Sequence, residues 1–207
     1  ARVALASSAL ALAACPSGGP GADDDDASGL DEIPVGTFVI TEVQANPLAN
    51  RPEFVEVFNT SSATQSLRGC QFGTGGASAN AFIIVGDAEI AAQSYGLLAS
   101  GAFLGNQEGE LPVDAVWTGV SINQNDDAET IELACPNGEG GRTLTDVVGF
   151  DPNVGWMPRR GHSWQLVGEI TASDNDDPGN WCEAPTQANT IYATIDGFPA
   201  YGTPGGP

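Results

Sequence analysis

Two stretches decide the fold, Thr37-Phe38-Val39-Ile40-Thr41-Glu42-Val43 and Glu53-Phe54-Val55-Glu56-Val57-Phe58. Both are rich in β-branched and aromatic residues, and apolar and polar side chains alternate along them, which is typical of strands. Residues 45–52, which lie between them, have Asn and Pro at turn positions. The two stretches therefore predict a pair of strands joined as a loose hairpin.

The rest of the chain continues in short apolar runs, nearly all of them separated by turn residues. Further strands are expected at residues 67–72, 81–85, 95–99, 115–117, 130–134, 144–150 and 163–167. No long window shows the apolar spacing of an amphipathic helix, and 27 Gly and 14 Pro oppose helix formation. The predicted class is all-β. Many short strands in one domain favour a sandwich of two packed sheets, with a closed barrel as the alternative.

The first residues have the pattern of a lipoprotein signal peptide. Arg2 supplies a positive charge, residues 3–11 are small and apolar, and Leu12-Ala13-Ala14-Cys15 resembles the lipobox of bacterial lipoproteins. The apolar run is well short of the roughly 20 residues that a membrane span needs. We therefore expect residues 1–14 to be removed and Cys15 to carry a lipid that holds the protein to a membrane.

The mature chain divides into a tether and one domain. Residues 15–34 are mostly Gly, Ser, Pro and Asp, which predicts a flexible acidic tether. Residues 35–207 are long enough for a single domain with a hydrophobic core. The formal net charge is −21, and all six basic residues are Arg. Since binding to phosphates needs clustered Lys and Arg, we do not expect a nucleic-acid partner.

The two strand stretches belong to a longer series of motifs. Phe38 to Pro47 contains an I-x-E-V strand and a proline-bearing turn, Glu53 to Asn59 contains F-V-E-V-F-N, and Leu67-Arg68-Gly69-Cys70 is L-x-G followed by Cys. The same three motifs open lamin tail domains, and in this order. The chain therefore resembles a lamin tail domain, and the resemblance implies an immunoglobulin-like β-sandwich.

The resemblance covers nearly the whole expected domain. Further motifs similar to those of the family are Ala91 to Ala99, Asn125 to Leu133, Asp146-Val147-Val148-Gly149-Phe150, Gly161 to Leu166, Trp181-Cys182-Glu183-Ala184 and Gly202-Thr203-Pro204-Gly205. In the first of these, Ala and Gln stand where the family has Pro and Gly. Residues 183–201 depart from the family pattern as a long insertion, and we assign no element to them.

Cysteine usage predicts one disulfide bond. With Cys15 assigned to the lipid, Cys70, Cys135 and Cys182 remain in an oxidising compartment, where pairing is expected. Three cysteines cannot all pair within the domain. Cys70 with Cys135 and Cys135 with Cys182 are both compatible with the spacing. A cysteine metal site is not expected, because no two cysteines have C-x-x-C spacing and the chain has a single His.

Two acidic loops offer side-chain oxygens at the density that calcium prefers. The candidate ligands are Asn125, Asp126, Asp127 and Glu129 in the first loop, and Asp174, Asp176 and Asp177 in the second. Neither loop fits the EF-hand pattern, and oxygen-rich turns also end the strands of any sandwich. We therefore predict a domain without a cofactor, with calcium in these loops as the alternative.

The sequence offers little for catalysis. His162 is the only imidazole base and precedes Ser163, but adjacent strand residues point to opposite faces, so His162 is interpreted as a surface histidine. Carboxylates such as Glu53 and Glu56 are interpreted as solvent-facing or hairpin-stabilising. A nucleophile elbow, an H-E-x-x-H motif and a P-loop are absent from the sequence. We therefore predict that the protein is not an enzyme.

These observations predict a lipid-anchored, non-enzymatic module at the cell envelope that contacts an unidentified envelope protein or glycan. Pro16 is not the aspartate that resembles an inner-membrane retention signal, which favours the outer membrane or cell surface. The family resemblance implies an accessory, adhesive or targeting role beside secreted or membrane-associated hydrolases. The alternative is a divalent-metal-dependent, nuclease-like hydrolase, or an accessory to one.

Overall fold

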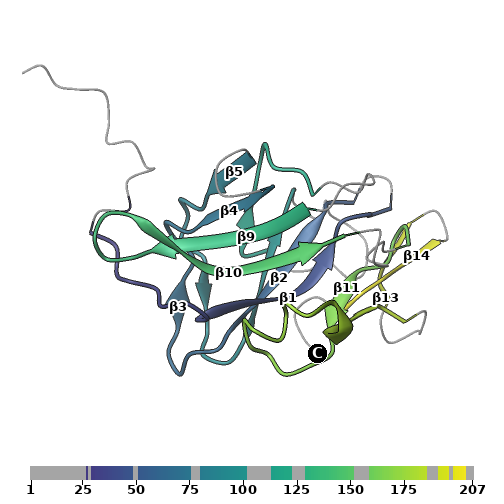
Figure 1. Ribbon diagram of the computed structural model, residues 1–207. Helices are drawn as coiled ribbons and strands as arrows, with labels where there is room; N and C mark the ends of the chain where they lie inside the picture. The colour runs from purple at the N-terminus through teal and green to yellow at the C-terminus, as the bar shows by residue number, and fades with distance from the viewer. Residues whose placement is uncertain are drawn as a thin grey trace, which may run out of the picture.

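The protein folds as an all-β sandwich, as the alternation predicted (Figure 1). The computed structural model describes residue 27 and residues 29–48, 51–75, 80–101, 113–122, 129–151, 159–185, 191–195 and 198–203. Two main sheets pack against each other and bury the core between them. Within the described residues, the helical structure is limited to a short 3₁₀ turn, Pro178–Asn180.

The larger sheet has six strands in the order β12-β11-β1-β2-β7-β8. Their bounds are β1 Phe38–Gln44, β2 Phe54–Asn59, β7 Tyr95–Ala99, β8 Ala115–Val116, β11 Trp164–Leu166 and β12 Trp181–Glu183. β1 and β2 pair antiparallel, as predicted from the two opening stretches. Their register shifts between Ile40 and Glu42, and this bulge decides which face Glu42 occupies.

The smaller sheet has four antiparallel strands in the order β10-β9-β4-β5. Their bounds are β4 Gln71–Thr74, β5 Asn80–Ile83, β9 Glu129–Pro136 and β10 Arg142–Phe150. Two small two-stranded sheets complete the fold. They are β3 Gln65–Ser66 with β6 Glu89–Ile90, and β13 Ile191–Ile195 with β14 Phe198–Tyr201.

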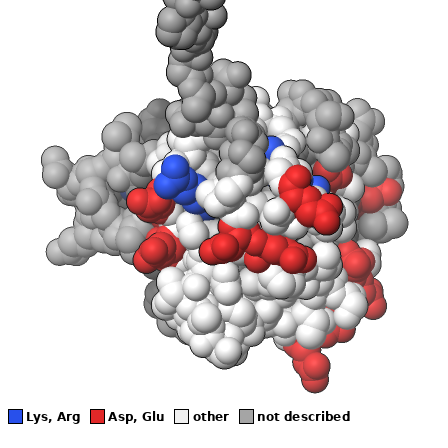
Figure 2. Space-filling view, turned by 90° about the vertical axis from the view of Figure 1, so that its left-hand side faces the viewer, with Lys and Arg blue, Asp and Glu red and all other residues white. Residues whose placement is uncertain are grey.

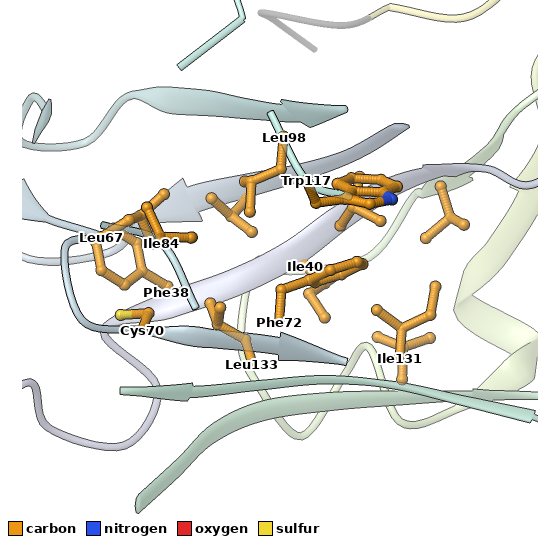
Figure 3. Close-up of a cluster of buried hydrophobic side chains, with 14 of the residues drawn as sticks. Phe38, Ile40, Leu67, Cys70, Phe72, Ile84, Leu98, Trp117, Ile131 and Leu133 are labelled. Atoms are coloured by element: carbon orange, nitrogen blue, oxygen red, sulfur yellow. The ribbon is translucent and has the colours of Figure 1, made fainter. Parts of the chain in front are cut away.

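The core lies between the two main sheets. Phe38 and Ile40 on β1 point toward Phe72 on β4 and Leu133 on β9, and all are buried (Figure 3). The indole of Trp117 packs on the ring of Phe72, with ring centroids 4.6 Å apart. Alternate residues of each strand therefore fill one shared interior, as the period-two pattern requires.

The core also contains the disulfide bond. Of the two pairings that the sequence left open, the structure has Cys70 bonded to Cys135, with both residues fully buried. Their neighbours Gln71 and Ala134 are register partners in β4 and β9. The bond therefore links the residue that precedes β4 to the neighbouring strand β9 of the same sheet. Cys182 is exposed and is the free cysteine of the described residues.

One prediction about the strands was wrong, and one segment left without an element contains two strands. Residues 67–72 do not form one strand, because Cys70 N–H donates to the carbonyl of Leu67 and Gly69 has a φ of +78°, which makes a turn before β4. Residues 183–201, which had no assigned element, contain β13 and β14. The signal for that hairpin was present in the sequence, because Asp196-Gly197 is a turn dipeptide between two apolar runs.

Asn59, at the end of β2, forms hydrogen bonds to residues 90–91, which are 31 and 32 residues further along the chain. Its fully buried amide nitrogen lies 2.8 Å from the carbonyl oxygen of Ala63, 3.0 Å from that of Ile90 and 3.1 Å from that of Ala91, and it donates to these groups. We expect Asn59→Ala to lower the free energy of unfolding by about 1–3 kcal/mol, because buried carbonyls lose their donor. Urea unfolding would measure the change. Ser62→Ala, at an exposed site, is the control and should change stability by less than about 0.5 kcal/mol; equal stability of the two variants would contradict the prediction.

Candidate functional site

Four strands of the larger sheet place one residue each in a row across its outer face. Glu42 on β1 is the register partner of Gln165 on β11 and of Glu56 on β2, and Glu56 is the partner of Leu97 on β7. Val43 and its β2 partner Val55 belong to the core. Because successive strand residues point to opposite faces, the two glutamates point away from the core and lie beside each other.

A pocket of about 350 Å³ opens over this row. It is lined by Thr41, Glu42, Glu56, Tyr95, Gln165, Leu166, Val167, Gly168, Ile170 and Thr203. The lining residues thus come from β1, β2, β7 and β11, from the segment after β11, and from the segment after β14. The pocket combines carboxylates, hydroxyls, one amide and one phenol, which makes it a candidate binding site.

Glu42 is buried deeply within the pocket wall, with 1% of its surface exposed. Its Oε1 accepts hydrogen bonds from the Ser163 hydroxyl at 2.5 Å and from the Thr203 backbone N–H at 3.1 Å, and its Oε2 accepts from the Thr203 hydroxyl at 3.4 Å. Burial raises the pKa of Glu42 from 4.5 to about 7, although these hydrogen bonds lower it. Glu42 therefore holds the segment after β14 against the sheet.

Glu56 is also buried, with 2% of its surface exposed. The Thr41 hydroxyl donates to its Oε1 at 2.9 Å. Beside it, the rings of Phe58 and Tyr95 have centroids 4.8 Å apart. Burial, and then the charge of Glu56, raise the pKa of the Tyr95 phenol, which keeps the phenol protonated as a donor.

Of the two interpretations of Glu56, solvent-facing or hairpin-stabilising, the structure supports the second, because Glu56 is buried and the Thr41 hydroxyl of the paired strand donates to it. It does face outward from the sheet, but residues 165–170 and Thr203 cover this part of the face. Glu53 also has a specific role, because its Oε2 accepts the backbone N–H of Ile122 at 3.1 Å and its Oε1 accepts the Ser121 hydroxyl at 3.4 Å. Neither role follows from local sequence.

The interpretation of His162 as a surface histidine was wrong. Its side chain is buried, with Nδ1 lying 3.0 Å from the carbonyl oxygen of Ala184 and 3.7 Å from Oε1 of Glu183. It is buried because residues 159–163 pack against β12, where the backbone N–H and side chain of Arg159 both bind Glu183. The adjacent Ser163 donates its hydroxyl to Glu42 and is fully buried.

The structure describes only one of the two acidic loops that were candidates for calcium. Asn125, Asp126, Asp127 and the side chain of Glu129 lie outside the described residues. In the second loop, Asp177 Oδ1 accepts the backbone N–H of Gly179 at 2.8 Å and caps the 3₁₀ turn. Across the described ranges, no three His, Cys, Asp or Glu side chains form a group that would hold a metal ion. Calcium binding stays an untested alternative.

A second hollow of about 280 Å³ lies on the outer face of the smaller sheet. It is lined by Gln71, Gly73, Glu132, Ala134, Arg142 and Leu144. Arg142 is engaged there, since its Nε donates to the carbonyl of Gly69 at 2.6 Å. Figure 2 shows one side of the molecule, on which acidic patches are more extensive than basic ones. Because Glu132 lines the second hollow, its substitution is a matched control for substitutions of Glu42 and Glu56 in the first pocket.

The predicted lipid site, Cys15, lies outside the described residues. The described residues contain no helix that is long and apolar enough to cross a membrane. A comparison with models of protein families finds none that matches the chain, and a comparison with characterised proteins finds no significant relative. The lamin tail resemblance is therefore a prediction that rests on its motifs alone.

Proposed function

We propose that the protein is a non-enzymatic binding module, held at the cell envelope by lipid on Cys15, and that the pocket over Glu42 and Glu56 binds a glycan. The observation that carries the proposal is the pocket itself. Its volume of about 350 Å³ fits a small ligand or one unit of a larger one.

The chemistry of the pocket wall suits a sugar. Carboxylates and amide oxygens accept hydrogen bonds from hydroxyl groups, while the phenol of Tyr95 donates them. The ring of Tyr95, which lines the pocket and packs against Phe58, adds an aromatic surface for the apolar face of a sugar ring. Sugars present both kinds of group, whereas an anionic ligand would be repelled by the two glutamates.

The tether supports a role at a distance from the membrane. The predicted tether, residues 15–34, is shorter than expected, because Ala27 and Ile33 are buried and the Ile33 backbone N–H donates to the carbonyl of Pro136 at 2.9 Å. The residues between Cys15 and Ala27 would still separate the lipid from the folded domain, so the pocket would reach ligands that do not lie in the bilayer. The net charge of −21 also opposes binding to anionic polymers.

Titration calorimetry with chitotetraose, cellotetraose and mannotetraose tests the proposal. At least one of these sugars should bind, and Glu56→Gln should weaken its binding by about tenfold or more, because a hydrogen bond to a charged group is lost. The matched control is Glu132→Gln, which makes the same change in the hollow of the other sheet. Absence of binding to all three sugars, or equal loss in both variants, would count against the pocket.

A second candidate function is glycoside hydrolysis, because Glu42 and Glu56 are adjacent and burial raises the pKa of Glu42 to about 7. An acid and a carboxylate flanking one bond is the arrangement used by glycosidases. The hydrogen bonds from Ser163 and Thr203 to Glu42 favour binding over catalysis. Release of reducing ends from the same three sugars, abolished by Glu42→Gln, would instead support the hydrolase.

A further inference from the structure

The segment that walls the pocket is anchored at one buried residue, Asn175. Val167, Gly168 and Ile170 line the pocket, and the chain then turns to place Asn175, which is fully buried. Its amide nitrogen donates to the carbonyl of Ile40 at 3.1 Å and to Oδ2 of Asp146 at 2.7 Å. Because Ile40 belongs to β1 and Asp146 to β10, the anchor contacts both main sheets.

Two oxygens at this anchor have no donor. Asp146 is 4% exposed, and its Oδ2 also accepts the Ile40 backbone N–H at 2.7 Å. Asp146 Oδ1 and Asn175 Oδ1 are both buried without a hydrogen-bond partner in the described part of the chain. Native proteins rarely leave buried acceptors unsatisfied, so each such atom needs an explanation.

One proton accounts for both oxygens. A protonated carboxyl carries an O–H donor, and a carboxamide oxygen accepts it. With the Asn175 N–H already bonded to Asp146 Oδ2, a proton on Asp146 Oδ1 directed at Asn175 Oδ1 completes a two-bond acid–amide pair. A bound cation would need several more oxygens than these two.

We propose that Asp146 is protonated in the folded protein and forms with Asn175 an acid–amide latch, whose loss of the proton loosens the segment walling the pocket. The latch itself does not depend on the proposed glycan function; only the consequence for ligand binding rests on it.

The surroundings of Asp146 favour the neutral acid. Burial raises its pKa from 3.8 to about 7, and the nearby charge of Asp176 raises it further, against the hydrogen bonds from Ile40, Asn175 and Val147. Among the described residues, no Arg or His pairs with Asp146. On β9, the register partner of Asp146 is the apolar residue Leu133. On β1, the group that contacts the carboxyl is the backbone N–H of Ile40.

The Asn175 backbone is tied as well, because the Trp181 indole N–H donates to its carbonyl at 2.8 Å. β12 thus holds one side of the anchor, and the Asp146 carboxyl holds the other. If the proton leaves, both side-chain oxygens are buried without a donor, and the carboxylate is also repelled by the negative charge of Asp176. The folded-state pKa is raised, so the latch is closed at lower pH and opens as pH rises through about 7.

Hydrogen exchange of the full chain, followed by mass spectrometry of peptides, tests the latch. After correction for intrinsic exchange, protection of residues 167–177 should fall by up to about tenfold for each pH unit as pH rises toward the raised pKa of Asp146, about 7, and should level off above it, while β9 keeps its protection. Asp146→Asn replaces the acid with an amide that makes the same two bonds and does not titrate. Its loop protection should be the same at about pH 6 and about pH 8.5.

Three results would overturn the proposal. The first is the same pH response in Asp146→Asn as in the parent chain. The second is loss of loop protection at both pH values in Asp146→Asn, which would show that a charge is required. The third is recovery of loop protection in the parent chain at high pH on adding millimolar calcium.

Asn175→Ala provides a second variant, should Asp146→Asn fail to fold. It should expose residues 167–177 at both pH values and leave β9 protected; protection equal to that of the parent chain would exclude the latch. The exchange measurement needs no ligand, so a pocket that binds no sugar would refute the proposed function without touching the latch. A pH-independent loop in a chain that does bind sugar would refute only the latch.

Discussion

Replacing both Cys70 and Cys135 with alanine is expected to lower the free energy of unfolding by about 4 kcal/mol, because the bond restricts the unfolded chain across a long loop. The two cysteines are 65 residues apart in sequence. For a domain of this size, that loss corresponds to a fall in melting temperature of roughly 8–16 °C. Urea and thermal unfolding of the oxidised parent and of the double variant would measure it.

The position of the bond supports a large effect. Both cysteines are fully buried in the core cluster; Cys70 follows the turn at Gly69, and Cys135 lies within β9. Alanine is the right replacement here, because serine would bury a hydroxyl at each site. Cys182→Ala is the control, since that thiol is exposed and free; it should leave stability within about 0.5 kcal/mol of the parent.

A result in which the double variant is as stable as the parent would contradict the chain-entropy argument. A result in which Cys182→Ala is the destabilised variant would instead indicate the alternative pairing of Cys135 with Cys182. Reduction of the parent chain should reproduce the double variant, which separates loss of the bond from loss of the side chains.

The local pattern of apolar and polar residues was sufficient to predict the strands that have one face in the core and one face outside it. β1 and β2 alternate between core and outer face, and Tyr95–Ala99 has the predicted bounds. It failed at residues 67–70, where Leu67 and Cys70 are both buried although the backbone turns at Gly69. An apolar run identifies burial, and a single left-handed glycine within it is enough to end the strand.

The site could be predicted only in part. The outer-face position of Glu42 was not accessible from sequence, because strict alternation puts Glu42 on the same face as Phe38 and Ile40, and the bulge moves it to the other face. Alternation with Val55 and Val57 does place Glu56 on the face opposite the core, and that much was accessible. The burial of the two glutamates was not, because it depends on residues 165–170 and Thr203, more than 100 residues further along the chain. Their adjacency depends on the cross-strand register and on the bulge after Ile40. None of these features has a local signal.

Asp146 and Asn175 illustrate the same limit. Asp146 was part of a recognised motif and Asn175 part of an acidic loop, but neither context suggests that the two side chains meet between the sheets. The density of acidic residues around Asn175 pointed to calcium. In the structure Asn175 is the buried residue of that loop, and Asp176 beside it is exposed.

The domain is expected to lose stability as pH rises from about 5 to about 8, which is the opposite of the usual behaviour of buried carboxylates in ion pairs. Burial raises the folded-state pKa of Glu42 from 4.5 and of Asp146 from 3.8, each to about 7. The folded state therefore binds these protons more tightly than the unfolded state does. Their stabilising effect is complete below the unfolded-state values and is lost as pH rises through about 7.

Over the whole transition, Glu42 should account for roughly 3–4 kcal/mol and Asp146 for roughly 4–5 kcal/mol, since one pKa unit corresponds to about 1.4 kcal/mol. Urea unfolding at a series of pH values would measure the slope. Glu42→Gln and Asp146→Asn should each remove about half of it, because the amides do not titrate. Glu132→Gln, whose pocket lies on the other sheet, should leave the slope unchanged.

General repulsion among the many acidic groups also weakens at low pH, so a slope in the parent chain is not sufficient evidence. The decisive comparison is between variants that each remove one negative charge: repulsion would be relieved equally by Glu132→Gln and by Glu42→Gln. If all three single variants flatten the slope to the same extent, net charge explains it and the two buried acids do not. If Glu42→Gln and Asp146→Asn alone flatten it, these two protons set the pH dependence of the fold.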